Sequence, residues 1–178
     1  MLPQGSICEG QVTISGRDLI SMNKEELQIF RRQNFGFIYQ DAIKRLNPLM
    51  SVGDHLFEQL KIHWRYKSNA SISKLVKENF NKVGISSKRL NSYPHEFSGG
   101  MRQRVCIAMA LALNPLILIA DEPTTSLDSH NCYEIMKQLL ELCNLNGSTL
   151  LLISHDIKLA EKWCKNVVIL DDGVIKER

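Results

Sequence analysis

An apolar run that ends in two adjacent acids is the feature that most constrains this chain. Leu116–Ala120 has the continuous apolar character of a buried parallel strand, and Asp121 and Glu122 follow it directly. Pro123 then prevents the strand from continuing. Acids that end a strand often only face water, but two adjacent acids favour a functional role. The pattern predicts an α/β protein whose sheet presents two carboxylates at its carboxyl edge.

A second pattern predicts a helix whose first turn is open to an anion. Ser98 is a good N-cap, Gly99 and Gly100 follow it, and Asn114-Pro115 ends the apolar helix that begins there. Glycines leave the backbone N–H groups at the positive helix end unhindered, which suits a phosphate. A Gly-Gly turn alone is weak evidence, and its place shortly before the two acids makes it informative.

Two more polar residues follow expected strands. Gln40 comes after Phe35–Tyr39, and His155 comes after Ser148–Ile153. Each could be an ordinary solvated residue, but the carboxyl ends of parallel strands meet at one edge. In that context Gln40 is a candidate for sensing a metal or water, and His155 for contacting a terminal phosphate. Asp128 is expected to cap the next helix, a role that can coexist with signalling.

The rest of the chain predicts one α/β unit with a helical insertion. Strands and helices alternate over the last 80 residues, which indicates a parallel sheet. The stretch from Asp41 to about Leu90 is helical in pattern, with loops near Asn47-Pro48 and Ser68–Ser71. The expected strands are 11–15, 35–39, 116–120, 148–153 and 166–170, and the expected helices include 23–32, 74–83, 98–114, 131–143 and 157–164.

Composition excludes several classes of protein. The 44% hydrophobic and 23% charged content is that of a globular chain, and a net charge of +3 is too small to predict a nucleic-acid surface. We see no signal peptide and no apolar run long enough to span a membrane. The five cysteines have no metal-type spacing, so we expect free thiols.

Taken in order, these motifs resemble the ATP-binding subunit of an ABC transporter. Gln40 matches the Q-loop, Ser98–Gln103 the signature and Leu118–Glu122 the Walker B strand. Ser126–Asp128 matches the D-loop, and His155 matches the switch histidine. The resemblance covers nearly the whole chain.

That resemblance implies a fold, cofactors and site residues. The fold would be a P-loop NTPase-like parallel sheet, with a helical subdomain at about 41–97 and the signature, Walker B, D-loop and switch-histidine region at 98–178. ATP and Mg²⁺ would be the cofactors, with Asp121 and Gln40 at the metal and Glu122 and His155 in catalysis. The residues implied in ATP binding are Gln40, Ser98, Gly99, Gly100, Met101, Asp121 and Asp128.

Within the family, the chain is similar to the importer branch for oligopeptides, dipeptides and nickel. Pro94–Leu111 carries that likeness, Phe97 and Ala42 depart from its usual residues, and Met101 points to the first of its two paired ATPase subunits. The resemblance implies a second ATPase subunit in a heterodimer, membrane permease subunits and, indirectly, an extracytoplasmic solute-binding protein, with no nucleic acid. It also implies a peripheral location on the cytoplasmic face of the membrane.

The P-loop of the family has no counterpart in these residues. Gly5 and Gly10 have the right spacing, but Gln11-Val12 replaces Lys-Ser/Thr, and Glu9 would repel phosphate. We therefore expect a cassette shortened at both ends and incomplete at the N-terminus, whose P-loop strand would lie beside the strand of Asp121. The alternatives to an importer ATPase are a non-catalytic partner that supplies the signature in trans, or an inactive fragment. A soluble DNA-repair or translation ABC protein is disfavoured, because no coiled-coil insertion or second cassette is present.

The segment from Asp41 to about Leu60 is expected to dock on a permease. It follows Gln40 directly, so a change at the metal site could reach it through few residues. It has more apolar residues than one small helix needs for its own core, so some of them could face a permease. Alternatively, they could all pack on the helix at 74–83. These residues are Leu46, Leu49, Met50, Val52, Leu56 and Phe57.

Overall fold

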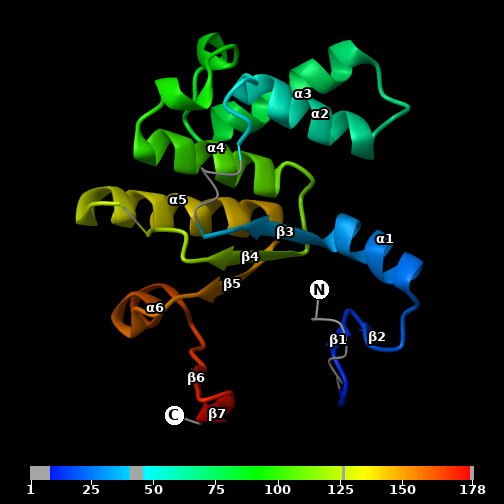
Figure 1. Cartoon of the computed structure of the whole chain (residues 1–178), viewed down its shortest axis with the longest axis vertical. Coiled ribbons are helices and arrows are strands. Elements are labelled where there is room, and N and C mark those ends of the chain that lie inside the picture. The colour runs from blue at the N-terminus through cyan, green and yellow to red at the C-terminus, as the bar shows by residue number, and fades with distance from the viewer. Residues whose placement is uncertain (1–8, 41–45, 126, 177–178) are drawn as a thin grey trace. The chain divides into compact units, whose positions relative to one another are not determined.

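The computed structural model describes residues 9–40, 46–125 and 127–176 (Figure 1). The chain divides into two compact units, residues 1–34 and residues 35–178. Gly5, Asp41, Ala42 and Ser126, to which sequence-based expectations were attached, lie outside the described residues. No helix among the described residues is long and apolar enough to cross a membrane.

The first unit is a short hairpin followed by a helix. Strands β1 (Thr13–Ile14) and β2 (Arg17–Asp18) pair antiparallel through a turn whose central residues both have positive φ, 50° at Ser15 and 74° at Gly16. A strand therefore follows Gly10 where a P-loop would open a helix, as the sequence predicts. Helix α1 (Lys24–Asn34) follows the hairpin, and the expected helix at 23–32 is thereby confirmed.

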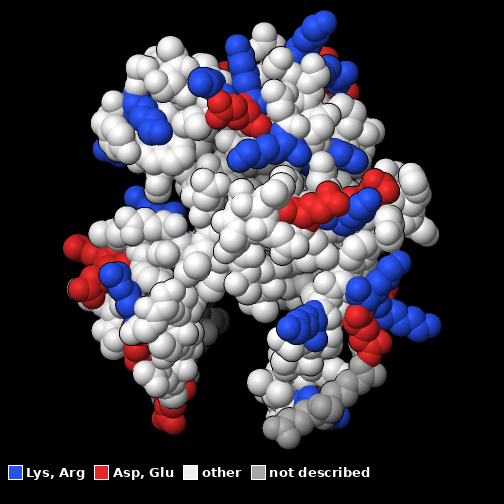
Figure 2. Space-filling model, turned by 180° about the vertical axis from the view of Figure 1, so that it is seen from behind, with Lys and Arg blue, Asp and Glu red and all other residues white. Residues whose placement is uncertain are grey.

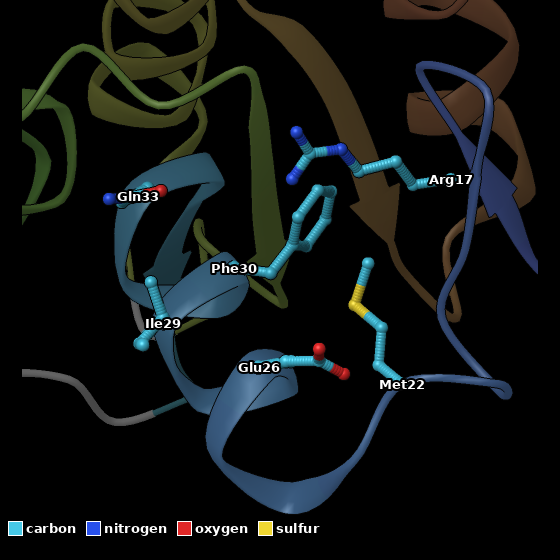
Figure 3. A pocket seen from close by; sticks show the side chains of 6 residues that line it. All are labelled: Arg17, Met22, Glu26, Ile29, Phe30 and Gln33. Atoms are coloured by element: carbon cyan, nitrogen blue, oxygen red, sulfur yellow. The ribbon is translucent and has the colours of Figure 1, made fainter.

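Reciprocal bonds at its start hold α1 in place. The Asn23 side-chain oxygen accepts the backbone N–H of Glu26 at 2.9 Å, and the Glu26 carboxylate accepts the N–H of Asn23 at 3.0 Å. Phe30 is the buried residue of α1. A pocket of about 340 Å³ lies between α1 and the β2 side of the unit, and Figure 3 shows its lining side chains, which are Arg17, Met22, Glu26, Ile29, Phe30 and Gln33.

The second unit contains a parallel sheet, which confirms the α/β prediction. Its strands are β3 (Phe35–Ile38), β4 (Ile117–Asp121) and β5 (Thr149–Ile153), in the order β3-β4-β5. The register pairs Ile38 with Ala120 and Ala120 with Leu152. All three strands therefore point their carboxyl ends to the same edge of the sheet.

The central place of β4 corrects one expectation. Both edges of β4 are already paired, so a further strand has no free edge beside Asp121, and the expectation that the P-loop strand lies there is wrong. Among the described strands, β5 forms the edge with exposed apolar side chains, with Leu151 51% and Ile153 49% exposed. An apolar run indicates that a strand is buried but says nothing about which strands flank it.

Helices cover the sheet and extend away from it. Helix α4 (Gly99–Leu111) contacts β3, α5 (Ser129–Asn146), α2 (Val52–His63) and α3 (Asn69–Lys82). Figure 1 shows α5 and α4 between the sheet and the α2–α3 pair. The remaining elements are the short helices η2 (Ser87–Arg89), η3 (Pro94–Glu96) and α6 (Ile157–Trp163) and the antiparallel strands β6 (Ile169–Asp171) and β7 (Val174–Lys176).

One close backbone approach fixes α4 against the sheet. A Cβ on Gly36 of β3 would lie 2.5 Å from the carbonyl oxygen of Ala110 in α4 and 2.9 Å from the ring of Pro115. Only glycine therefore fits at this crossing. The core beneath it includes Ile107, Leu118, Met136 and Leu139, all essentially inaccessible.

One expected loop and one expected strand need correction. The loop expected at Ser68–Ser71 is wrong, because Ser68 caps α3 and its hydroxyl accepts the N–H of Ser71 at 3.2 Å. The loop lies just before Ser68, at residues 64–68. The antiparallel pair β6–β7 extends past the expected strand at 166–170, and β7 was not predicted. The four described cysteines are free thiols, as expected.

Candidate functional site

The ends of the three parallel strands gather the polar residues that the sequence singled out. Asp121 ends β4 and is paired in register with Ile153, the last residue of β5. Gln40 follows β3 by two residues, and His155 follows β5 by two residues. The carboxyl edge of the sheet thus carries an amide, two carboxylates and an imidazole.

Glu122 has a backbone conformation that few non-glycine residues adopt. Its φ is 48°, in the left-handed region, which costs free energy for a residue with a side chain. Its N–H donates to the carbonyl oxygen of Ile153 at 2.9 Å, so the turn after β4 is tied to the end of β5. Because of this strained turn, the Glu122 side chain does not continue the alternation of side chains between the two faces of the sheet along β4.

The Glu122 carboxylate has three donors. Its Oε1 accepts the backbone N–H of His155 at 2.7 Å and lies 2.5 Å from His155 Nδ1. Its Oε2 accepts the hydroxyl of Thr125 at 3.1 Å. The Glu122 side chain is 14% exposed, whereas the His155 side chain is 85% exposed. A carboxylate has no proton to give, so this contact places the imidazole proton on Nδ1.

These contacts lower the pKa of Glu122. Burial acts to raise it, but the backbone N–H of His155, the imidazole and the Thr125 hydroxyl together outweigh burial and hold the pKa below its ordinary value. Glu122 is therefore a carboxylate at neutral pH, which is the form that can accept a proton from water. Sequence reasoning did not identify Thr125, whose place three residues after Glu122 gave no signal.

Asp121 and Gln40 are the residues at this edge of the sheet that could hold Mg²⁺. The described residues contain no group of three His, Cys, Asp or Glu side chains that could hold a metal. Mg²⁺ needs no such group, because it keeps several waters and takes one or two carboxylates together with phosphate oxygens. One carboxylate and one amide oxygen at neighbouring strand ends fit that preference.

The start of α4 has the open first turn that the sequence predicts. The Ser98 hydroxyl accepts the N–H of Met101 at 3.4 Å and caps the helix. A Cβ on Gly99 would meet only Leu127, at 3.8 Å, and one on Gly100 would meet the Asn131 side-chain oxygen at 3.4 Å. The turn at Ser98–Gly100 therefore lies against the segment that begins α5.

Asp128 is the cap of α5. Its carboxylate accepts the Asn131 backbone N–H at 2.9 Å and the Asn131 side-chain amide at 2.6 Å. The backbone N–H and then the amide of Asn131 hold the pKa of Asp128 below its ordinary value. Asn131 is thus bonded to Asp128 and lies near Gly100, a placement that sequence reasoning missed because Asn131 is typical of an ordinary helix residue.

An apolar groove of about 350 Å³ lies beside β3, α2 and α4. Its lining residues are Phe35, Gly36, Phe37, Tyr39, Leu46, His55, Gln59, Cys106, Met109, Ala110 and Leu113. The Gln59 side chain donates to the Met109 carbonyl at 3.0 Å across the junction of α2 and α4. The groove begins close to Gln40, since Tyr39 is one of its walls.

The expected excess of apolar residues at 41–60 is only partly present at the surface. Leu46, Val52 and Leu56 are buried in the core, and Leu49 is 86% exposed. The helical spacing of the apolar residues could not show which of them are buried and which are exposed, because α2 packs on both α3 and α4.

A parallel sheet with helices on it and this set of strand-end residues defines an ATP-binding cassette fold. The chain belongs to the ABC transporter family, whose profile, described as "ABC transporter", matches residues 3–125. The resemblance seen in the sequence is thereby confirmed.

Relatives and solved structures agree with this assignment. The chain is 39% identical over 178 residues to the oligopeptide transport ATP-binding protein OppD of Bacillus subtilis, covering 99% of this chain and 49% of that protein. It is 39% identical over 173 residues to the dipeptide transport ATP-binding protein DppD of Lactococcus lactis, covering 96% and 50%. The chain thus spans about half the length of these relatives.

The fold is similar to solved cassettes. A dimeric post-hydrolysis state of the ATP-binding cassette MJ0796 bound to ADP and Pi matches with a TM-score of 0.79 and 32% identity, over 95% of this chain and 72% of that one. CbiO1 from Clostridium perfringens, part of the ABC transporter complex cbiONQ, matches with a TM-score of 0.83 and 27% identity, over 95% and 65%.

Proposed function

We propose that these residues belong to the ATP-hydrolysing subunit of an ABC importer for peptides. The observation that carries the proposal is the Glu122 carboxylate, held ionised at the end of β4 by His155. The names of the B. subtilis and L. lactis relatives favour peptides over nickel as the solute.

The roles of the site residues follow from their chemistry. Bound ATP supplies a terminal phosphoryl group that can be transferred to water, and Asp121 with Gln40 would hold its Mg²⁺. Glu122 accepts the proton of the attacking water at a carboxylate oxygen. His155 binds Oε1 through its backbone N–H and its Nδ1, so a contact between this imidazole and phosphate would use Nε2.

The signature turn and the D-loop would act on the nucleotide of a partner. Ser98, Gly99, Gly100 and Met101 offer a capped helix start with room for phosphate oxygens. Asn131, which is bonded to Asp128, lies near Gly100 of this turn. This placement supports a role for the D-loop in sensing whether the signature turn is bound to the partner's nucleotide.

The proposed assembly has two ATPase subunits, which we infer to differ from each other, and membrane permease subunits at the cytoplasmic face of the membrane. An extracytoplasmic solute-binding protein would act indirectly. Within this chain, residues 41–97 would form the helical subdomain and 98–178 the region of the signature, Walker B, D-loop and switch histidine. Leu49 and the apolar groove beside β3 would form the permease-docking surface, since Tyr39 joins the groove to Gln40.

A second candidate function is a non-catalytic partner. These residues contain no Gly-x-x-x-x-Gly-Lys-Ser/Thr, whereas the start of α4 is fully formed. Such a partner would supply Ser98, Gly99 and Gly100 to ATP held by another subunit and would hydrolyse nothing itself.

A chimera separates the two candidates. These 178 residues would replace the matched residues of B. subtilis OppD, and peptide-dependent growth and ATPase activity would be measured with Glu122 and with Glu122→Gln. The importer ATPase predicts activity that the substitution lowers by about 10²–10⁴-fold. Activity that is the same with both residues would favour the non-catalytic partner.

A further inference from the structure

The loop between α2 and α3 combines several bases with exposed apolar side chains. Residues 61–73, which we name the α2–α3 tip, contain the bases Lys61, Arg65 and Lys67 and no acid. Ile62 is 62% exposed and Tyr66 is 82% exposed. The nucleotide chemistry described above uses none of these residues.

The fold gives the tip a fixed shape. Helix α2 ends with the Trp64 N–H bonded to the Leu60 carbonyl at 2.8 Å, and the Ser68 hydroxyl caps α3. Lys61 Nζ donates to the carbonyl of Lys67 at 2.9 Å, and Lys67 Nζ lies 4.5 Å from the centre of the Trp64 ring. The loop therefore holds the Lys67 ammonium over a half-buried indole and ties the Lys61 ammonium to its own backbone.

Acids in the described part of the chain leave this charge without an ion pair. Among the residues that the structure describes, no carboxylate forms an ion pair with Lys61, Arg65 or Lys67. The first turn of α3 carries no acid, and Glu78, farther along α3, lies 3.9 Å from Lys74. Glu58, one turn before Ile62 on α2, is exposed. Figure 2 shows Lys and Arg side chains, with Asp and Glu side chains among them, over the helical part at the top of the view.

We propose that the α2–α3 tip binds the anionic surface of a lipid bilayer. Bases next to an anionic membrane are attracted to lipid headgroups, and Tyr and aliphatic side chains insert at the level of those headgroups. Exposed Ile62 and Tyr66 beside Arg65 fit such a surface. A nucleic-acid surface would need a wider basic area than a net charge of +3 provides, and exposed Ile62 would contribute little to it.

This surface goes beyond the proposed ATPase and does not depend on it. The tip uses side chains that touch neither Glu122 nor the start of α4, so vesicle binding and ATP hydrolysis are separate measurements. Loss of one leaves the other intact.

Co-sedimentation with vesicles tests the proposal. The purified 178-residue chain is mixed with vesicles of phosphatidylcholine plus phosphatidylglycerol and with vesicles of phosphatidylcholine alone. Binding to the anionic vesicles is expected to fall about fivefold for each base removed, hence on the order of a hundredfold for Lys61→Gln, Arg65→Gln and Lys67→Gln together. Raising the salt concentration should weaken it as well.

A matched control removes the same charge elsewhere. Lys137, Lys158 and Lys165 are exposed, and changing all three to Gln leaves the same net charge as the tip variant. Binding of the control variant should stay within a few-fold of the unchanged chain. Equal losses in both variants, equal binding to uncharged vesicles, or binding to duplex DNA without binding to vesicles would each overturn the proposal.

A variant with fewer substitutions tests whether lost binding could result from unfolding. Arg65 and Tyr66 are both exposed, so Arg65→Gln with Tyr66→Ser removes one base and one ring with little effect on the core. Circular dichroism checks that the fold is kept, and binding should fall about tenfold or more. A folded double variant that binds anionic vesicles as well as the unchanged chain would refute the role of the tip.

Discussion

Glu122 Oε1 accepts the backbone N–H of His155 at 2.7 Å and lies 2.5 Å from the Nδ1 of the same residue. One carboxylate oxygen thus binds both the main chain and the side chain of a residue that lies two positions after β5. Because Glu122 N also donates to Ile153, β4 and β5 are joined through both the backbone and the side chain of Glu122. The proposed base is therefore also part of the structure that holds the sheet edge together.

The first prediction concerns acid stability. The pKa of Glu122 is lowered from 4.5 in the folded chain, so its ionised form stabilises the fold above pH 4.5, and this contribution is lost as the pH falls through the folded pKa. Glu122→Gln should lower the free energy of unfolding by about 1–2 kcal/mol at pH 7, because the bonds to a charged group become neutral ones.

Urea unfolding at pH 7 and at a pH well below 4.5 checks this. The difference between the two chains should shrink in acid, and Thr125→Ser, which keeps the hydroxyl near Oε2, serves as a control. A difference that is constant from neutral to acid pH would mean that the Glu122 charge does not stabilise the turn.

The second prediction concerns the crossing of β3 and α4. Gly36→Ala should destabilise the chain by about 1–3 kcal/mol or prevent folding, since its Cβ would lie 2.5 Å from the backbone oxygen of Ala110. Gly99→Ala is the matched control, because its Cβ would meet only Leu127 at 3.8 Å. Thermal unfolding of both variants gives the comparison, and equal midpoints would show that α4 can move away from the sheet at little cost.

The strand of Asp121 and the helix after Ser98 could be predicted from the sequence because local signals mark them. A continuous apolar run, Pro123, and the Ser98 cap each act within a few residues. The neighbours of β4 could not be predicted, since apolar character does not identify a pairing partner. The P-loop strand was expected beside β4, but β3 and β5 occupy both edges of that strand.

Contacts between separate helices and strands could not be predicted from the sequence for the same reason. Val52 and Leu56 are buried because α2 packs against two helices, whereas Leu49 precedes α2 and stays exposed. Thr125 and Asn131 join the site through hydrogen bonds and close contacts that no spacing rule indicates. The sequence therefore predicts which residues gather at the strand ends, but not the residues that contact them.

The third prediction concerns catalysis. The 178 residues alone should hydrolyse no ATP above background, because no lysine in a phosphate-binding loop is present in them to hold the phosphates. A phosphate-release assay on the purified chain measures this. Turnover by the isolated chain that Glu122→Gln abolishes would show that another element grips the phosphates.

The last prediction concerns the permease. Leu49 is 86% exposed just before α2, whereas Val52 is inaccessible, so only a cysteine at Leu49 reports on a partner surface. In the chimera with the B. subtilis relative, Leu49→Cys should cross-link to single cysteines in the cytoplasmic loops of the permease. Lys137→Cys on α5, exposed and far from β3 in sequence, is the control and should not cross-link to the same loops. If the chimera supports peptide uptake while Leu49→Cys cross-links no more than Lys137→Cys, the permease docks elsewhere on this chain.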